Sequence, residues 1–192
     1  LQGLPRQDRR VEFIRESLVG LDEDLRTLSG KPGAGIIARH GVGYEEVARL
    51  AQELGAQVVF AAHDYEPQAI ARDIKARGAM ADLGISFHTV KDQVIFEGRE
   101  LLTKTGTPYG VFTPYKNAWL ARLNDACLKT HEVASLSGAL AERPASMRRR
   151  VMTLAELGFE QTNLLELKIP TGSAGASELF STFFDRMDRY DE

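Results

Sequence analysis

Apolar residues recur every three or four positions near the start of the chain, the pattern of one buried helical face. Between Asp8 and Leu28 this apolar stripe predicts a helix. Gly30 and Pro32 follow and would end it. Because the pattern stops there, we interpret it as a helix packed on a sheet, with a coiled coil as the alternative. The stripe consists of Val11, Ile14, Leu18, Leu21, Leu25 and Leu28.

Short apolar runs then alternate with further helical patterns. Buried strands are predicted at residues 34–40, 56–63 and 85–90, and helices at residues 44–54 and 67–83. Alternation at these lengths predicts the α/β fold class, with a Rossmann-like parallel sheet and flanking helices. Such a sheet binds ligands at the carboxyl ends of its strands, and here two of those ends would carry His40 and His63.

The alternation stops after residue 91. Residues 92–110 are predicted to be a loop, with a hairpin as an alternative. A helix should follow, with the Thr113 hydroxyl as its N-cap and Pro114 in its first turn. We expect the apolar side chains of this helix to pack into the domain, namely Trp119, Leu120 and Leu123.

The remainder of the chain predicts a connector and a final helix. The small, polar and basic residues from Cys127 to Arg150 suit a surface connector, and we interpret the run from Arg148 to Arg150 as solvated rather than as a phosphate contact. The last helix presents an apolar face with no later partner in the sequence, so we expect both ends of the chain to be cut from a longer protein. That face consists of Leu179, Phe180, Phe183, Phe184, Met187 and Tyr190.

Composition narrows the classes of function. The chain has 192 residues, of which 43% are hydrophobic, and a net charge of −3, which argues against a surface that attracts nucleic acid as a whole. The single cysteine, Cys127, cannot form an internal disulfide. We found neither a long apolar run nor a signal peptide and therefore predict a soluble, cytoplasmic protein.

No reaction can be derived from motif spacing alone. The glycine-rich phosphate-binding motifs of dinucleotide-binding folds and P-loop proteins are absent from the sequence. The four histidines show no metal-ligand spacing, so we predict no metal site. His40 and His63 are interpreted as hydrogen-bonded loop residues rather than catalysts. These residues indicate an α/β domain that could hold a planar ligand.

Four segments, in this order and at these intervals, resemble a known family. The segments "DRRVEFIRESLVGLDEDL", "AAHDYEPQAIARD", "FHTVKDQVIFEG" and "GTPYGVFTPYKNAWLARL" look like the N-terminal antenna domain of the DNA photolyase and cryptochrome family. The resemblance covers essentially the whole chain, but nothing corresponds to the family's first two strands or its helical FAD domain. It implies a partial antenna domain at residues 1–125, an interdomain connector at 126–173 and the first helix of the FAD-binding domain at 174–192.

The resemblance implies light-driven repair of cyclobutane pyrimidine dimers, a carbon-carbon lyase reaction that depends on FAD. Damaged DNA would be bound through the absent FAD domain, with the dimer flipped out of the duplex, and the full-length protein would be a monomer. This chain alone is expected to perform no repair. A cryptochrome-type photoreceptor and a free-standing nucleotide-binding module remain the alternatives.

The resemblance also implies which residues contact the antenna pigment. In deazaflavin-type members an Asp precedes the x-E-P segment and an Arg precedes the first long helix; these match Asp64 and Arg10, and Glu66 belongs to the same motif. The Glu that holds the pterin in folate-type members is replaced by Ala69, so a deazaflavin is favoured over methenyltetrahydrofolate. The alternative is that Asp64 caps the next helix and Arg10 pairs with a surface acid. The resemblance further implies that Tyr115 and Lys116 contact the FAD domain.

Overall fold

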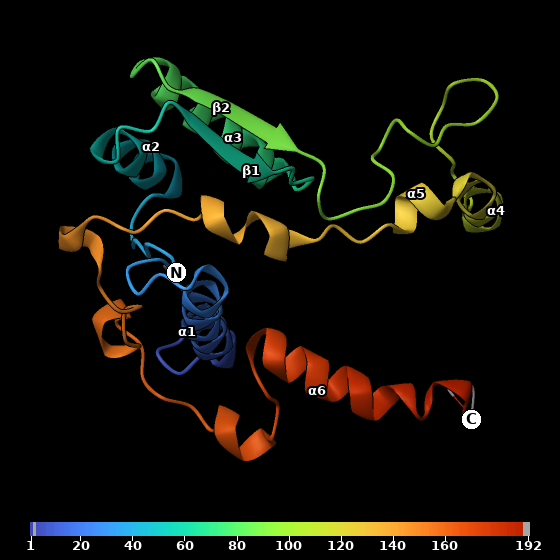
Figure 1. Ribbon diagram of the computed structural model, residues 1–192. Coiled ribbons are helices and arrows are strands. Elements are labelled where there is room, and N and C mark those ends of the chain that lie inside the picture. The colour runs from blue at the N-terminus through green and yellow to red at the C-terminus, as the bar shows by residue number, and fades with distance from the viewer. Residues whose placement is uncertain (2, 190–192) are drawn as a thin grey trace. The chain divides into compact units, whose positions relative to one another are not determined.

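The computed structural model describes residues 1 and 3–189, which form two compact units. Unit 1 contains residues 1–39 and 132–192, and unit 2 contains residues 40–131. Unit 1 is therefore built from both ends of the chain. Figure 1 follows the chain from the blue helix α1, through the green strands of unit 2, to the red helix α6.

Unit 2 contains a small parallel sheet. Strands β1 (Val58–Ala62) and β2 (Ser86–Val90) pair in parallel, with Val58 opposite Ser86. Helix α2 (Gly43–Glu53) precedes β1, and helix α3 (Pro67–Ala81) connects the two strands. The predicted helices and the last two predicted strands are therefore confirmed, and so is the α/β class with a parallel sheet and flanking helices.

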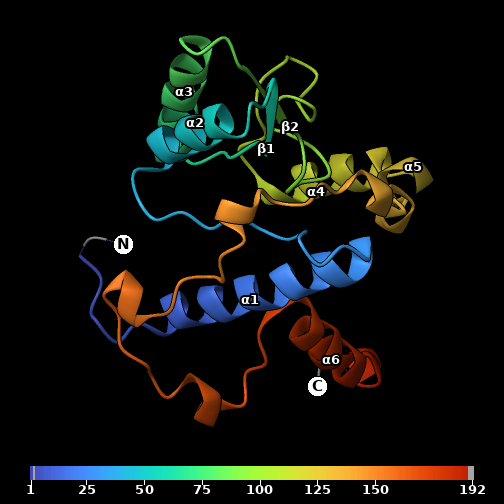
Figure 2. The same ribbon diagram turned by 60° about the vertical axis from the view of Figure 1, so that its left-hand side comes forward.

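The core of unit 2 lies between its sheet and its helices. Figure 2 shows α2 and α3 together on one side of the sheet. Met80 of α3 is fully buried there, and Val59 and Phe87 from the sheet pack against the same cluster. The opposite face of the strands is open, and Phe60 is 70% exposed with its ring stacked on that of His88. The other buried residues of the core are Ala48, Ala51, Ala76 and Ile85.

A long loop leads from β2 to helices α4 (Phe112–Arg122) and α5 (Asp125–Leu128). Residues 91–111, all of them described, contain no strand, so the alternative of a hairpin is wrong. The predicted N-cap is also wrong, because α4 begins before Thr113, with Val111 at the N-cap position. Pro114 then occupies the third helical position. The N–H groups of a helix's first turn have no partner within the helix, so the missing N–H of Pro114 costs no hydrogen bond there.

The aromatic residues of this region form a small cluster around Phe96. The ring of Trp119 meets that of Phe96 edge-on at 5.7 Å, and the Arg122 guanidinium lies 5.6 Å from the centre of the Phe96 ring. Trp119 and Leu123 are half-buried. Leu120 is 54% exposed, so the expectation that it packs into the domain is wrong. The reason is geometric, because Phe96 lies on the Trp119 side of the helix.

In unit 1, helix α1 (Arg9–Ser29) confirms the first predicted helix. The Asp8 side chain caps its start by accepting from the Arg10 amide. Gly30 ends it with φ of 64°, a left-handed conformation that favours glycine. Helix α1 packs against α6 (Gly172–Phe184), and Figure 2 shows the two side by side.

The buried side of α1 differs from the predicted apolar stripe. Val11 is buried, but Ile14 is 58% exposed, and Leu21 and Leu28 are exposed too. The acids Glu12 and Asp22 are buried instead, at 3% and 4% exposure. These acids are buried because segments from the far end of the chain supply hydrogen-bond donors to them.

The first donor is Arg143, which is 7% exposed. Its guanidinium lies 3.1 Å from Asp22 Oδ1 and also donates to the backbone oxygens of Gly33 and Ile36. Asp22 Oδ1 in turn accepts from the Ile36 amide at 2.9 Å. The expected strand at residues 34–40 is therefore wrong, because side chains take the backbone groups that a neighbouring strand would pair.

The second donor is Thr162, whose amide and hydroxyl both donate to Glu12. Residues 132–171 thus lie along α1 as a series of short 3-10 turns rather than as a free linker. In this segment Arg148 pairs with Glu142 and Arg150 with Glu156, so these two arginines are exposed but not simply solvated. The turns are η1 (Val133–Ala139), η2 (Ala145–Met147), η3 (Ala155–Leu157) and η4 (Leu164–Leu167), and η5 (Met187–Arg189) follows α6.

The face of α6 that the sequence marks as apolar is exposed as far as the structure describes it. Phe180 and Phe184 are 60% and 57% exposed, and their rings lie 5.9 Å apart. Tyr190, predicted as part of this face, lies outside the described residues. Within the described part of the chain, none of the helices combines the length and hydrophobicity that crossing a membrane requires.

Candidate functional site

The carboxyl end of β1 carries the predicted pigment contacts of unit 2. The His63 amide donates to Val90 O at 2.7 Å, which continues the strand pairing to this residue. Asp64 follows, and its carboxylate accepts from the Glu66 amide at 3.2 Å and lies 3.8 Å from the Arg72 guanidinium. The Asp64 side chain is 30% exposed, so its oxygens remain within reach of a ligand.

Glu66 occupies the N-cap position of α3, and Pro67 opens the helix. The Glu66 side chain is exposed and makes no cap hydrogen bond. Asp64 does not cap α3 in the usual sense, because it bonds to the amide of the N-cap residue rather than to an amide inside the helix. Ala69, which replaces the pterin-holding Glu of folate-type relatives, is buried in the first turn of α3.

Arg10 lies in unit 1, in the first turn of α1. Its Nε donates to Asp8 Oδ1 at 3.0 Å, and a second guanidinium nitrogen donates to Asp8 Oδ2 at 2.6 Å. The Arg10 side chain is 73% exposed while that of Asp8 is buried. The ion pair therefore fixes the guanidinium plane and leaves much of it open to solvent.

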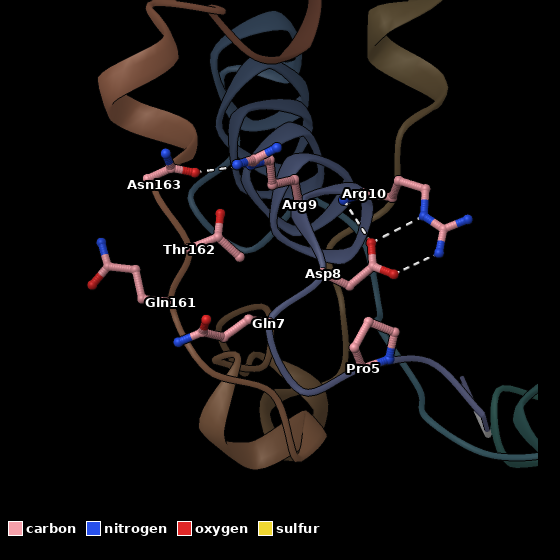
Figure 3. A pocket seen from close by; sticks show the side chains of 8 residues that line it. All are labelled: Pro5, Gln7, Asp8, Arg9, Arg10, Gln161, Thr162 and Asn163. Carbon is pink, nitrogen blue, oxygen red and sulfur yellow. Dashed lines mark hydrogen bonds and ion pairs between the residues drawn. The ribbon is translucent and has the colours of Figure 1, made fainter.

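A polar cavity of about 740 Å³ lies beside this ion pair. Figure 3 shows it between the start of α1 and the segment 161–163, with Arg9 Nε donating to Asn163 Oδ1 at 2.9 Å. Thr162 lines the cavity and also holds Glu12. Guanidinium, amide and hydroxyl groups in this arrangement suit the polar edge of a ligand. The lining residues are Pro5, Gln7, Asp8, Arg9, Arg10, Gln161, Thr162 and Asn163.

The Arg10 guanidinium also controls the ionisation of Asp8. Its hydrogen bond lowers the pKa of the Asp8 carboxyl from 3.8 to about 2. A carboxyl whose pKa is lowered on folding stabilises the fold above its unfolded pKa. That contribution is lost as the pH falls from about 4 towards 2.

We therefore expect Asp8→Asn to flatten the acid side of the stability profile. Asparagine still caps the helix, but it has no charge to pair with Arg10. The free energy of unfolding of the variant should be lower than that of the parent at pH 5 and should fall less steeply between pH 4 and pH 2. Denaturant titrations at several pH values measure this, with Glu23→Gln on the exposed surface of α1 as the control. An unchanged acid slope would contradict the role of the pair.

Motif reasoning missed a third group of residues, centred on Glu97 in the loop after β2. Glu97 Oε1 lies 2.5 Å from His63 Nδ1 and accepts from the Tyr65 hydroxyl at 2.8 Å. The interpretation of His63 as a hydrogen-bonded residue is confirmed, whereas the strand that His40 was expected to end is not formed. An acid 34 positions from its histidine has no sequence signal of its own.

The predicted contacts with the FAD domain lie on α4. Tyr115 is 37% exposed, and its ring lies 6.1 Å from that of Tyr109. Lys116 is exposed as well. Arg10 thus belongs to unit 1, whereas Asp64, Glu66, Tyr115 and Lys116 belong to unit 2.

Comparison with known proteins identifies the family. The family model described as DNA photolyase matches residues 3–136. The chain belongs to the DNA photolyase family. This photolyase-family chain is 30% identical to a deoxyribodipyrimidine photo-lyase of Halobacterium salinarum over 182 residues, which cover 94% of the chain and 36% of that protein.

Two further photolyases match the chain. A deoxyribodipyrimidine photo-lyase of Synechococcus sp. is 25% identical over 97% of the chain and 38% of its own length. One of Escherichia coli is 31% identical over 71% of the chain and 29% of its own length. The photolyase-family chain therefore spans roughly a third of the length of these curated relatives.

Proposed function

We propose that this chain is the light-harvesting part of a deoxyribodipyrimidine photo-lyase that repairs cyclobutane pyrimidine dimers in DNA. The observation that carries the proposal is the alignment with a protein of that name along 94% of the chain. We propose the division expected from the sequence, with the antenna domain at residues 1–125, the connector at 126–173 and the start of the FAD domain at 174–192. On this proposal FAD and the damaged DNA are bound by parts of the protein outside the chain.

We propose Asp64, Glu66 and Arg10 as contacts of the antenna pigment. The pigment would supply light absorption, and FAD the electron that splits the dimer. The partly exposed Asp64 carboxylate can accept from ring N–H groups, and Glu66, two positions further along the chain, adds an exposed carboxylate. Arg10, its plane fixed by Asp8, can lie flat against a conjugated ring. Each of these side chains can therefore make one kind of contact that a planar pigment with N–H donors would require.

A deazaflavin is the pigment that we favour over methenyltetrahydrofolate. The position of the pterin-holding Glu is Ala69, which is buried and has no polar side-chain group. We also propose that Tyr115 and Lys116, exposed on α4, contact the FAD domain, and that the intact protein is a cytoplasmic monomer.

The test of the proposed function is to identify what the intact protein binds and what it repairs. We expect denaturation to release FAD and a deazaflavin, identified by mass, and light to restore dimer-containing oligonucleotides. FAD and repair without a second pigment would refute the antenna role. FAD and pigment without repair would indicate a cryptochrome-type photoreceptor, and a protein without FAD would indicate a free-standing α/β module.

Replacing Asp64 with asparagine is expected to weaken pigment binding by roughly 10- to 100-fold, since a hydrogen bond to a charged group contributes about 1.5–3 kcal/mol. Pigment content per FAD, read from the absorption spectrum, measures the loss. Repair driven by light that FAD itself absorbs should persist. Asp82→Asn, at the exposed far end of α3, is the matched control. Equal pigment content in both variants would remove Asp64 from the site.

A further inference from the structure

Helix α6 begins beside α1, and a side chain of α1 bonds to its first turn (Figure 2). Thr171, at the N-cap position of α6, makes no side-chain cap hydrogen bond. The amide of Gly172, the first helical residue, donates instead to Ser17 Oγ at 3.1 Å. Ser17 Oγ itself donates to Phe13 O at 2.8 Å, which leaves a lone pair for the Gly172 amide. A residue 155 positions away thus satisfies one of the amides that the start of a helix leaves unpaired.

The backbone around the start of α6 permits this close approach. Gly172 has φ of 70°, a left-handed conformation that favours glycine. Gly175 is buried, and a Cβ atom at this position would lie 2.5 Å from the carbonyl carbon of Pro170. The two glycines therefore allow a turn too tight for larger residues.

The contacts with α6 lie on the side of α1 that carries Arg10. Ser173 Oγ donates to Asp24 Oδ2 at 3.1 Å, seven positions beyond Ser17. Arg10 lies seven positions before Ser17. Residues seven apart in a helix differ in direction by only about 20°. At a rise of about 1.5 Å per residue, the start of α6 is thus held roughly 10 Å along α1 from Arg10.

A serine inside α1 has a cost that an alanine would avoid. Serine favours a helix less than alanine does, and a hydroxyl that bonds back to the preceding turn slightly destabilises the helix. Ser17 has both properties, since it lies inside a 21-residue helix and bonds to Phe13 O. If its bond to α6 had no effect, Ser17→Ala would stabilise α1. The sign of the change in stability therefore reports whether Ser17 acts on α6.

We propose that Ser17 is a positioning residue that holds the start of α6 beside Arg10, so that unit 1 sets the separation and orientation of the antenna pigment and FAD. This inference rests on the proposed function, in which Arg10 contacts the pigment and residues 174–192 begin the FAD domain. Transfer of excitation energy between two pigments falls steeply with their separation and depends on their mutual orientation. Loosening the contact between α1 and α6 would therefore lower the transfer efficiency without changing the amount of pigment or FAD bound.

The test compares Ser17→Ala with Ser181→Ala in the intact protein. Ser181 is an exposed serine of α6 whose side chain makes no hydrogen bond within the described part of the chain, so it is the matched control. Loss of a neutral hydrogen bond should raise amide exchange in the first turn of α6 by about 2- to 10-fold. Transfer efficiency, read from the excitation spectrum of repair and normalised to bound pigment, should fall in Ser17→Ala alone. Ser17→Thr, which retains the hydroxyl, should restore both quantities.

A second variant displaces the start of α6 further. Gly175→Ala places a methyl group against the backbone of Pro170, so the turn must shift, and we expect a larger loss of transfer than in Ser17→Ala. Gly20→Ala is its control, because a Cβ atom at Gly20 would meet nothing within 4 Å. Circular dichroism confirms that each variant is folded, and the pigment and FAD contents of each are measured.

Two results would overturn the proposal. One is unchanged amide exchange in Ser17→Ala, and the other is parental transfer efficiency in both Ser17→Ala and Gly175→Ala. Exchange and transfer that change together, with pigment and FAD still bound, would support it. Parental transfer in variants that bind pigment and repair dimers would refute this inference and leave the proposed function standing. An intact protein without pigment would refute the antenna role itself, and amide exchange would still show whether Ser17 holds α6.

Discussion

Replacing Arg143 with alanine is expected to lower the free energy of unfolding of unit 1 by about 3–5 kcal/mol. Both side chains of the Arg143 and Asp22 pair are 6% exposed, so the variant leaves a buried carboxylate without one of its two arginine partners. It also removes the donor to Gly33 O and Ile36 O. Chemical denaturation followed by amide hydrogen exchange in α1 measures the effect.

The neighbouring exposed arginine provides the matched control for this variant. Arg149→Ala removes the same type of side chain from the same segment, but from an exposed position, and should change stability by less than about 0.5 kcal/mol. If Arg143→Ala costs less than about 1 kcal/mol, then Arg26, which lies 2.8 Å from Asp22, is sufficient to hold the buried acid.

Replacing Met80 with alanine is expected to destabilise unit 2 by about 2–5 kcal/mol. Met80 is fully buried between the helices and the sheet, so truncation leaves a cavity in the one core cluster that the described residues of this unit form. Met80→Leu preserves most of the volume and should cost less than about 1.5 kcal/mol. Denaturant titration monitored by amide exchange in β1 and β2 compares the two. Equal losses would show that shape rather than volume controls this core.

The elements of unit 2 could be predicted because their signals are local. Helices α2 and α3 and strands β1 and β2 each carry an apolar pattern of the correct period, and Gly55 and Gly84 mark the helix ends. The error at Thr113 has a local cause too, since proline is favoured at the first helical position but is also tolerated later in the first turn, where Pro114 lies.

Unit 1 could be predicted only in part because its decisive contacts are distant in sequence. The helical period of α1 was correct, but its buried side was not, since Glu12 and Asp22 are buried by partners 150 and 121 positions away. Asp22 and Arg143 also bond to the backbone of Gly33 and Ile36, so residues 34–40 do not form the expected strand. Nothing in an isolated pattern tells a buried acid from a solvated one.

The candidate site was predicted from the family resemblance rather than from spacing. Asp64, Glu66 and Arg10 were named in that way, and their pigment contacts remain predictions. Glu97 was missed because its significance depends on the loop returning to the end of β1, a three-dimensional fact. The segment "FHTVKDQVIFEG", one of the four that carry the family resemblance, contains Glu97, but the resemblance implied no role for this residue.

The discontinuous construction of unit 1 has a consequence for synthesis on the ribosome. Helix α1 emerges before unit 2, yet the donors for its two acids are translated more than a hundred residues after the acids themselves. Unit 2, which is continuous in sequence, can complete its core during that interval, since chains emerge N-terminus first. Until Arg143 and Thr162 are translated, Asp22 and Glu12 lack these two partners. If the nascent chain were released before residue 143, the backbone oxygens of Gly33 and Ile36 would therefore lack the Arg143 guanidinium that donates to them in the folded protein.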